Sequence, residues 1–205
     1  MTEPAPARPP LSPRERMVRA AGRLIRTKGV SGTGLREVVA VADAPWGSLQ
    51  SYFPGGKTQL VTEALLWMGG VAARRVDRVL TGLDRPSPGA LFAGTVDLWR
   101  AEFLKDGFDA GCPLVAAAAD VASTSDELRA AIGAAFEGWH APLAAALVRT
   151  GVPPEQKDSL ATVLISALEG AIVLSRVRRD VAPLDAVAAE LGPWLDAMAR
   201  PRGGR

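Results

Sequence analysis

The chain has 205 residues, of which 48% are hydrophobic and 22% are charged. These values are ordinary for a folded protein of one domain or two small ones, and they exclude a wholly disordered chain. The longest stretch without a charged residue, from Ala44 to Gly56, has 13 residues. A membrane-spanning helix needs about 20 apolar residues, so we expect no integral membrane protein.

Few residues are suited to redox, metal or histidine chemistry. Cys112 is the only cysteine and His140 the only histidine, which excludes an intrachain disulfide framework and any multi-cysteine metal site. We therefore expect no metal and no other cofactor. The segment from Met1 to Pro10 lacks the apolar core of a secretory signal, so the cytoplasm is the expected location.

The net charge of +2 is unevenly distributed along the chain. Residues 1–57 hold nine basic and four acidic side chains, which gives this segment a net charge of +5. The remaining 15 basic and 18 acidic side chains give residues 58–205 a net charge of −3. This asymmetry indicates that one end of the protein meets a polyanion and that the other end does not.

The first predicted helix follows a proline-rich arm over residues 1–12, which we expect to be mobile. Ser12 and Glu15 have the spacing of an N-cap and an N3 residue, and Gly29 is a typical helix end, so a helix is predicted over 13–28. One face of this helix carries four arginines, Arg16, Arg19, Arg23 and Arg26. They form a solvated charged face or, for one or two of them, contacts to phosphate groups.

Two short helices are predicted next, within the basic segment. Apolar periodicity favours a helix over 35–42 and another over 46–52, separated by the breaker Asp43-Ala44-Pro45. Two short helices joined by a turn of three or four residues are the sequence pattern of a helix-turn-helix. The apolar residues expected to hold it to the core are Leu35, Val38, Val39, Leu49, Phe53 and Leu60.

From residue 57 onward the pattern is helical throughout, and no stretch alternates with the period of a convincing strand. Six further helices are predicted, over 57–80, 88–105, 112–122, 125–149, 154–179 and 183–199. We therefore expect an all-α fold with about nine helices.

The segment from Gly34 to Leu60, GLREVVAVADAPWGSLQSYF followed by PGGKTQL, resembles the helix-turn-helix of TetR-family transcriptional regulators. Its Phe-Pro-Gly-Gly-Lys variant and the later Gly-Cys-Pro-Leu at 111–114 are similar to the LmrA/YxaF-like branch of that family. The resemblance implies a DNA-binding domain over 13–56 and a helical ligand-binding and dimerisation domain over 57–205. It further implies a homodimeric, ligand-responsive repressor that binds a palindromic operator and releases it when a small apolar or aromatic effector is bound.

Several residues within or beside this motif have side chains suited to contact DNA. Gln50 can form two hydrogen bonds with adenine, at a position where the family usually has Tyr. Trp46 replaces the usual Lys or Arg, and Lys57 begins the next helix, where its ammonium can meet a phosphate. The predicted DNA-binding residues are Thr33, Trp46, Gly47, Ser48, Gln50, Ser51, Tyr52 and Lys57. For the Thr and Ser residues, helix capping or solvent exposure is the alternative interpretation.

The last two predicted helices have apolar faces too broad for the edge of a monomer. In the resembled family these helices form a four-helix dimer interface, so a homodimer is expected. The middle helices carry aromatic residues with few charges, which favours an apolar ligand pocket oriented by one polar group. The candidate ligand-binding residues are Trp67, Trp99, Phe103, Phe108, Cys112, Phe136, Trp139, His140 and Glu169. Ordinary core packing is the alternative for each aromatic residue.

Two other function classes compete with a DNA-binding regulator. A small all-α enzyme would need catalytic groups that the sequence scarcely offers, and the Gly-Lys-Thr at 56–58 lacks the upstream glycine and preceding strand of a phosphate-binding loop. A helical adaptor that does not bind DNA leaves the charge of +5 over residues 1–57 unexplained.

Overall fold

The computed structural model describes residues 10–199, and over that range the chain is helical and contains no strand. This described part of the chain forms nine α-helices and one 3-10 turn (η1): α1 (Pro13–Lys28), α2 (Leu35–Val41), α3 (Ser48–Tyr52), α4 (Gly56–Thr81), α5 (Pro88–Asp106), α6 (Pro113–Val121), α7 (Asp126–Arg149), η1 (Pro154–Gln156), α8 (Lys157–Arg178) and α9 (Ala182–Ala199). The all-α prediction is confirmed. Most of the arm predicted over 1–12 lies outside the described residues.

Short-range signals set the ends of α1. The Glu15 backbone N–H donates to Ser12 Oγ at 3.2 Å, and the Ser12 N–H donates to Glu15 Oε2 at 2.9 Å, which is the reciprocal capping box. At the other end, Gly29 has a φ of 71° and its N–H donates to the Ile25 carbonyl. Glycine adopts this left-handed conformation without steric cost, so the chain leaves the helix there.

Two predicted helix starts are wrong by two or three residues. Trp46 and Gly47 belong to a turn in which the Ser48 N–H donates to the Pro45 carbonyl at 3.0 Å, so α3 begins at Ser48. Residues 154–156 form the 3-10 turn η1 rather than the first turn of α8. Both shifts follow a proline, which starts a tight turn readily because its φ is fixed.

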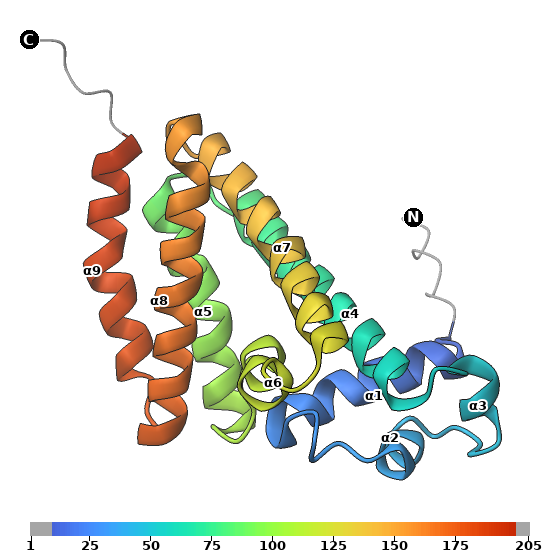
Figure 1. Cartoon of the computed structure of the whole chain (residues 1–205). Coiled ribbons are helices and arrows are strands. Elements are labelled where there is room, and N and C mark those ends of the chain that lie inside the picture. The colour runs from blue at the N-terminus through green and yellow to red at the C-terminus, as the bar shows by residue number, and fades with distance from the viewer. Residues whose placement is uncertain (1–9, 200–205) are drawn as a thin grey trace, which may run out of the picture.

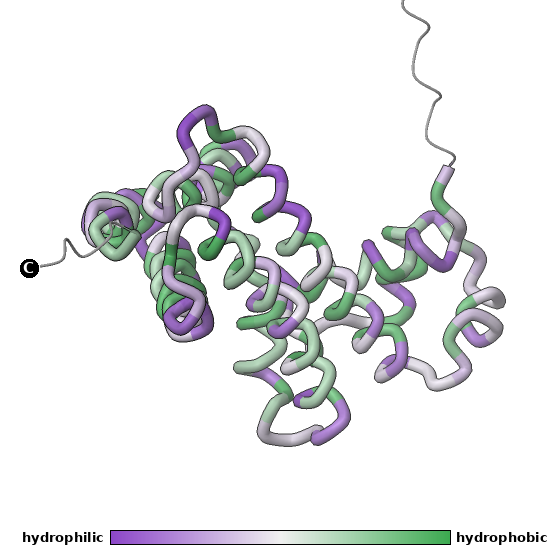
Figure 2. The backbone as a smooth tube through the Cα atoms, turned by 90° about the horizontal axis from the view of Figure 1, so that it is seen from above, coloured by the Kyte–Doolittle hydropathy of each residue, from purple (hydrophilic) through white to green (hydrophobic). Residues whose placement is uncertain are grey.

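The helices form two regions joined by α4 (Figure 1). At one end α1, α2 and α3 gather, and α1 packs against α4, α2 and α6. Beyond them α4 continues alongside α7, while α5 packs against α9 and α8 packs against α7 and α9. Seen from above, the region of α1 to α3 stands at the opposite end of the molecule from α8 and α9 (Figure 2). One long helix therefore spans the distance between the predicted DNA-binding end and the predicted dimer helices.

A single cluster of buried apolar side chains passes through both regions. It includes Met17 and Ile25 in α1, runs through Leu65 in α4 and reaches Leu168 and Ile172 in α8. Close-packed interiors resist compression and transmit displacement. The two regions are therefore mechanically connected, although the predicted division into domains at residues 56 and 57 remains a prediction.

Two helical segments, Asp126–Arg149 and Pro154–Arg178, are long and apolar enough to cross a membrane by length and composition alone. Core helices of soluble proteins are often as long and as apolar as these two segments. In this fold α7 packs against α4 and α8, and α8 packs against α7 and α9, so both apolar helices have protein partners.

The closest approach between α4 and α7 depends on a glycine. A Cβ atom added to Gly69 would lie 2.4 Å from the Ala135 carbonyl oxygen, a backbone atom that cannot rotate away. On the same helix pair, Gly133 of α7 is exposed, and a Cβ added there meets nothing within 4 Å. The two positions therefore form a matched pair for testing the packing.

We predict that Gly69→Ala lowers the free energy of unfolding by about 1–3 kcal/mol, because the two helices must separate to admit the methyl group. Gly133→Ala should raise it by up to about 1 kcal/mol, because alanine favours a helix over glycine. Urea denaturation followed by circular dichroism measures both. Equal effects of the two substitutions would contradict this packing.

Candidate nucleic-acid interface and internal cavity

The helix-turn-helix is held to the core by its inner face. Val38 and Val39 of α2, and Leu49 and Phe53 at α3, are at most 6% exposed. Since α3 has only five residues, these anchors fix which way it faces. Its opposite side, with Gln50 and Ser51, is exposed to solvent. The structure thus presents a short polar helix face of the kind that can enter a major groove.

An arginine of α1 holds the turn between α2 and α3. Arg16 donates from Nε to the Ala42 carbonyl and from a terminal nitrogen to the Asp43 carbonyl, both at 2.7 Å. Asp43 has a φ of 46°, in the left-handed region that non-glycine residues rarely adopt. The two hydrogen bonds satisfy backbone oxygens beside this unusual residue and so stabilise the geometry of the motif.

The arginine face of α1 consequently contributes less to a DNA surface than its charge suggested. Arg16 is committed to the turn, the Arg19 guanidinium lies 5.5 Å from the centre of the Trp67 ring, and Arg26 forms an ion pair with Glu102. Of the four, Arg23 is the one whose side chain is exposed. The other three arginines are engaged in intramolecular contacts, which could not be predicted from the sequence.

The predicted DNA-binding residues around the turn are largely accessible. Trp46 is 53% exposed, and the Arg36 guanidinium lies 5.9 Å from its ring centre. A Cβ added to Gly47 would meet nothing within 4 Å, so no intramolecular contact requires a glycine there. The Ser48 hydroxyl donates to the Pro45 carbonyl at 2.6 Å and thus serves the turn, although the residue remains half-buried.

Thr33 requires a correction. Its side chain is 2% exposed and its hydroxyl donates to the Gly29 carbonyl at 2.6 Å, so it stabilises the loop before α2 instead of facing DNA. Tyr52 is half-buried. Lys57 is half-buried too, and its Nζ donates to the Ser31 carbonyl at 3.4 Å, at the edge of hydrogen-bonding distance. This weak contact leaves the ammonium with donors for a phosphate.

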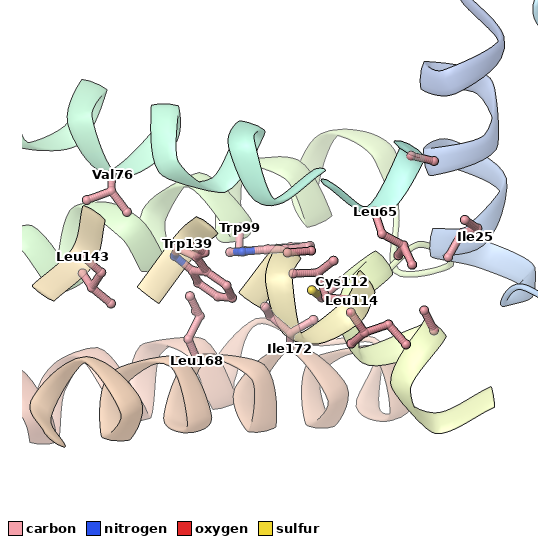
Figure 3. Close-up of a cluster of buried hydrophobic side chains, with 14 of the residues drawn as sticks. Ile25, Leu65, Val76, Trp99, Cys112, Leu114, Trp139, Leu143, Leu168 and Ile172 are labelled. Atoms are coloured by element: carbon pink, nitrogen blue, oxygen red, sulfur yellow. The ribbon is translucent and has the colours of Figure 1, made fainter. Parts of the chain in front are cut away.

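An internal cavity of about 50 Å³ lies between six helices. Figure 3 shows Trp99, Trp139 and Cys112 in the cluster of side chains around it, between α4 and α8. The lining residues are Arg26, Met68, Val71, Ala72, Arg75, Thr95, Leu98, Trp99, Cys112, Pro113, Leu114, Trp139 and Glu169. The cavity is mainly apolar, with three ionisable groups besides the thiol.

Four of the nine candidate ligand-binding residues meet in this cavity: Trp99, Cys112, Trp139 and Glu169. Phe103 and Phe108 are not among its lining residues. Phe103 is 1% exposed, and its ring stacks on Phe108 at a centroid distance of 5.0 Å. This geometry favours core packing, the alternative named from the sequence, for these two aromatic residues.

The other three candidates lie in separate surface hollows. Trp67 faces a groove between α1 and α4, where Arg19 covers its ring. Phe136 and His140 face a hollow between α7 and α8, and His140 Nε2 lies 3.0 Å from the Asp158 carbonyl and 3.1 Å from Thr162 Oγ1. All three residues belong to helices that line the cavity, but their side chains lie on a different face of the helix.

The basic residues of the cavity wall were not predicted from the sequence. Arg26 and Arg75 both pair with Glu102, and their guanidinium groups lie 5.3 Å and 5.7 Å from the centre of the Trp99 ring. Burial alone would raise the pKa of Glu102, but Arg26 and then Arg75 lower it below its ordinary value. No periodicity could assign this triad, because it joins α1, α4 and α5.

Glu169 is in the opposite electrostatic situation. Burial raises its pKa to about 7, and the Cys112 thiol offsets only a part of that shift. Both carboxyl oxygens are buried, and among the described residues they have no partner other than this weakly donating thiol. Burial, and then the neighbouring Glu169, raise the pKa of Cys112 well above its usual range, so this thiol is not activated.

Comparisons with known proteins agree with this architecture. The family model for the C-terminal domain of LmrA/YxaF-like transcriptional regulators matches residues 88–190. An uncharacterized helix-turn-helix transcriptional regulator of Mycobacterium tuberculosis is 38% identical over 184 residues, covering 87% of this chain and 92% of the relative. The transcriptional regulator LmrA of Bacillus subtilis is 31% identical over 171 residues, covering 83% of this chain and 90% of LmrA.

A solved structure shows the same fold over nearly the whole chain. The crystal structure of a TetR transcriptional regulator from Legionella pneumophila matches with a TM-score of 0.76 at 20% identity, covering 90% of this chain and 98% of that one. The chain belongs to the TetR family of transcriptional regulators. This family is not enzymatic, which removes the enzyme alternative, and membership implies binding to operator DNA and dimerisation.

The raised pKa of Glu169 predicts a pH dependence of this TetR-family protein's stability. A carboxyl whose pKa rises from 4.5 to about 7 on folding binds its proton more tightly in the folded state, so stability falls as pH rises through that interval. Between pH 5 and pH 8, wild type should lose about 2–3 kcal/mol of unfolding free energy relative to Glu169→Gln. Denaturant titrations at both pH values measure this difference.

Glu127→Gln provides the control, because Glu127 is exposed in the first turn of α7. Its unfolding free energy should follow wild type at both pH values. A constant difference between wild type and Glu169→Gln from pH 5 to pH 8 would show that the buried carboxyl does not titrate as described.

Proposed function

We propose that this TetR-family regulator is a ligand-responsive repressor, which binds a palindromic operator as a homodimer and releases it when a small molecule occupies the internal cavity. The observation that carries the proposal is the exposed outer face of α3, with Gln50 and Ser51, on a helix whose inner face is anchored by Leu49 and Phe53. This face lies within the segment of net charge +5. We further propose that the protein acts in the cytoplasm, where its operator would be found.

In the proposed complex, base contacts and phosphate contacts come from different residues. Gln50 reads a base edge in the major groove, and Ser51 adds a hydroxyl on the same exposed side. Lys57, with Tyr52 and Ser48, contacts the DNA backbone and positions the helix without reading sequence. Trp46 and Gly47 directly precede α3. The exposed Trp46 ring can pack on the sugar–phosphate backbone, and Gly47, which has no side chain, permits close approach of the DNA to the protein backbone.

The proposed dimer interface is an exposed apolar stripe on α8 and α9. Its residues on α8 are Val163, Val173, Leu174 and Val177, which are 42–78% exposed, and Trp194 on α9 is 41% exposed. Their spacing on α8 places them on one face, and an exposed apolar face of this kind is typical of a protein–protein interface. A twofold axis through such a patch satisfies both copies at once and gives a symmetric pair of α3 helices.

The helix α6 connects the cavity with the helix-turn-helix. Its N-terminal end supplies Cys112, Pro113 and Leu114 to the cavity wall. In its last turn, the Asp120 carboxylate accepts hydrogen bonds from the Ser31 N–H at 2.6 Å and from the Ser31 hydroxyl at 2.7 Å. The Ser31 hydrogen bonds lower the pKa of Asp120, so the contact involves an ionised carboxylate.

A cavity of about 50 Å³ is smaller than the roughly 150 Å³ that holds a benzene ring. An effector of that size must therefore enlarge the cavity, and α6 forms one of its walls. We propose that this displacement moves Asp120 and, through Ser31, the loop that precedes α2.

We predict that Gln50→Ala and Lys57→Ala weaken DNA binding in different ways. Lys57→Ala should weaken binding to every sequence alike and reduce the salt dependence by about one counterion, because it removes a phosphate contact. Gln50→Ala should cost about 1–3 kcal/mol on the preferred operator and relax the base preference, because it removes a base contact. Gel shifts with DNA flanking the protein's own gene, at several salt concentrations, measure both effects.

Lys105→Ala is the matched control, since Lys105 is an exposed cation in the last turn of α5, outside the basic segment. It should leave DNA binding unchanged. Sequence-specific binding that survives the combined loss of Gln50 and Lys57 side chains would overturn the assignment of α3 as the recognition helix.

The dimer interface predicts a second outcome. Leu174→Glu should raise the dimer dissociation constant by about 100-fold or more, because a carboxylate would be buried in both copies of a symmetric apolar interface. Leu104→Glu, at a residue 67% exposed on α5, introduces the same charge outside the stripe and should leave the dimer intact. Sedimentation velocity distinguishes the two. A wild-type chain that stays monomeric at micromolar concentration would refute the interface.

A further inference from the structure

Glu169 is the unexplained group of the internal cavity. Its side chain is 7% exposed and lines the cavity, and among the described residues only the Cys112 thiol, a weak hydrogen-bond donor, is placed to interact with its carboxyl oxygens. Buried polar groups in folded proteins nearly always have a good partner, so a carboxyl left with a thiol alone points to a missing ligand or water. The missing partner has to donate hydrogen bonds, since an ionised carboxylate only accepts them.

The basic residues of the wall are already committed. Glu102 pairs with both Arg26 and Arg75, and Arg26 Nε donates to the Gly111 carbonyl at 2.8 Å. Both guanidinium groups also lie over the Trp99 ring. An anionic ligand would have to compete with Glu102 for these donors, whereas a cation at Glu169 would displace no ion pair among the described residues.

Trp139 supplies a second element of recognition. It lines the same cavity, and among the described residues no guanidinium or ammonium lies over its ring. The face of a tryptophan ring attracts cations more strongly than any other side-chain ring. A carboxylate and an indole face within one apolar cavity form a site with charge and shape complementary to an organic cation.

We propose that the cavity binds a small lipophilic amine, whose protonated nitrogen donates to the Glu169 carboxylate and lies against the Trp139 ring. Its apolar part fills the space beside Met68 and Leu98, and larger amines enter by widening the cavity at α6. Only the role of the amine as effector rests on the proposed function; the binding of the amine does not. Occupancy of the site can be measured without DNA.

The ionisation of Glu169 provides the test. Burial raises its pKa to about 7, and an ammonium partner favours the ionised form, so amine binding at neutral pH must release a proton. The other ionisable groups lining the cavity are Arg26 and Arg75, which are paired, and Cys112, whose raised pKa keeps it neutral here.

Charged groups on the neighbouring helices have partners elsewhere or, like Glu137 and Glu190, are exposed at the surface. On α7, His140 contacts the Asp158 carbonyl and Thr162. On α9, Asp185 pairs with Arg100 and Asp196 accepts a hydrogen bond from the Gly89 N–H. The pH dependence of amine binding is therefore assigned to Glu169.

Benzylamine and benzyl alcohol form a matched pair of probes with nearly the same shape and different charge. Isothermal titration calorimetry of the full chain should show benzylamine binding about tenfold more tightly at pH 8 than at pH 6, because the ionised fraction of a group with a pKa of about 7 rises tenfold over this interval. Benzyl alcohol should show no such change. Glu169→Gln should abolish the pH dependence and the preference for the amine, and the surface control Glu127→Gln should retain both.

Wild type alone also tests the proposal, should Glu169→Gln fail to fold. At pH 7, titrations in buffers of different ionisation enthalpy should show release of about half a proton per benzylamine bound. Equal affinities for amine and alcohol, or amine binding without proton release, would overturn the proposal. These titrations contain no DNA, so the two proposals can fail separately. Absence of operator binding would overturn the proposed function without affecting the amine site. Absence of amine binding would overturn the amine site without affecting the proposed operator binding.

Discussion

The position of the DNA-binding end depends on a partly buried ion triad. Glu102 of α5 accepts from Arg26 of α1 and from Arg75 of α4, and the carboxylate side chain is only 16% exposed. Such a group costs desolvation energy, and loss of one partner leaves a charge poorly compensated, so the triad favours one relative position of the three helices. Since Arg26 also lines the cavity, α1 contacts both the helix-turn-helix, through α2, and the proposed effector site.

This arrangement gives the cavity two physical connections to the DNA-binding surface. Arg26 provides the first, and α6 provides the second through Asp120 and Ser31, which hold the loop before α2. A packed core transmits displacement, so a ligand that widens the cavity acts on both connections. Glu102 lies beside the cavity and is paired twice, whereas Glu169 lines the cavity and forms no ion pair. This contrast underlies the amine selectivity that we propose.

Much of the fold could be predicted because helix signals are local. Capping residues such as Ser12 and Gly29, and apolar periodicity, set most helix ends to within a residue or two. Side-chain partners could not be predicted in the same way. Arg16 binds carbonyls 26 and 27 residues away, and Thr33 is buried against its own loop. In the cavity, aromatic content indicated the right helices, but only tertiary packing decides which face of each helix lines it.

The central claim is that a symmetric dimer presents two copies of α3 to successive major grooves of one operator. Pulsed electron paramagnetic resonance on the operator-bound protein tests it most directly, with a spin label at Val41→Cys, an exposed position of α2 outside the proposed DNA contacts, in a Cys112→Ala background. The account predicts one dominant distance between subunits near 35 Å, about one turn of DNA. An absent intersubunit distance, or one far from a single helical turn, would contradict it.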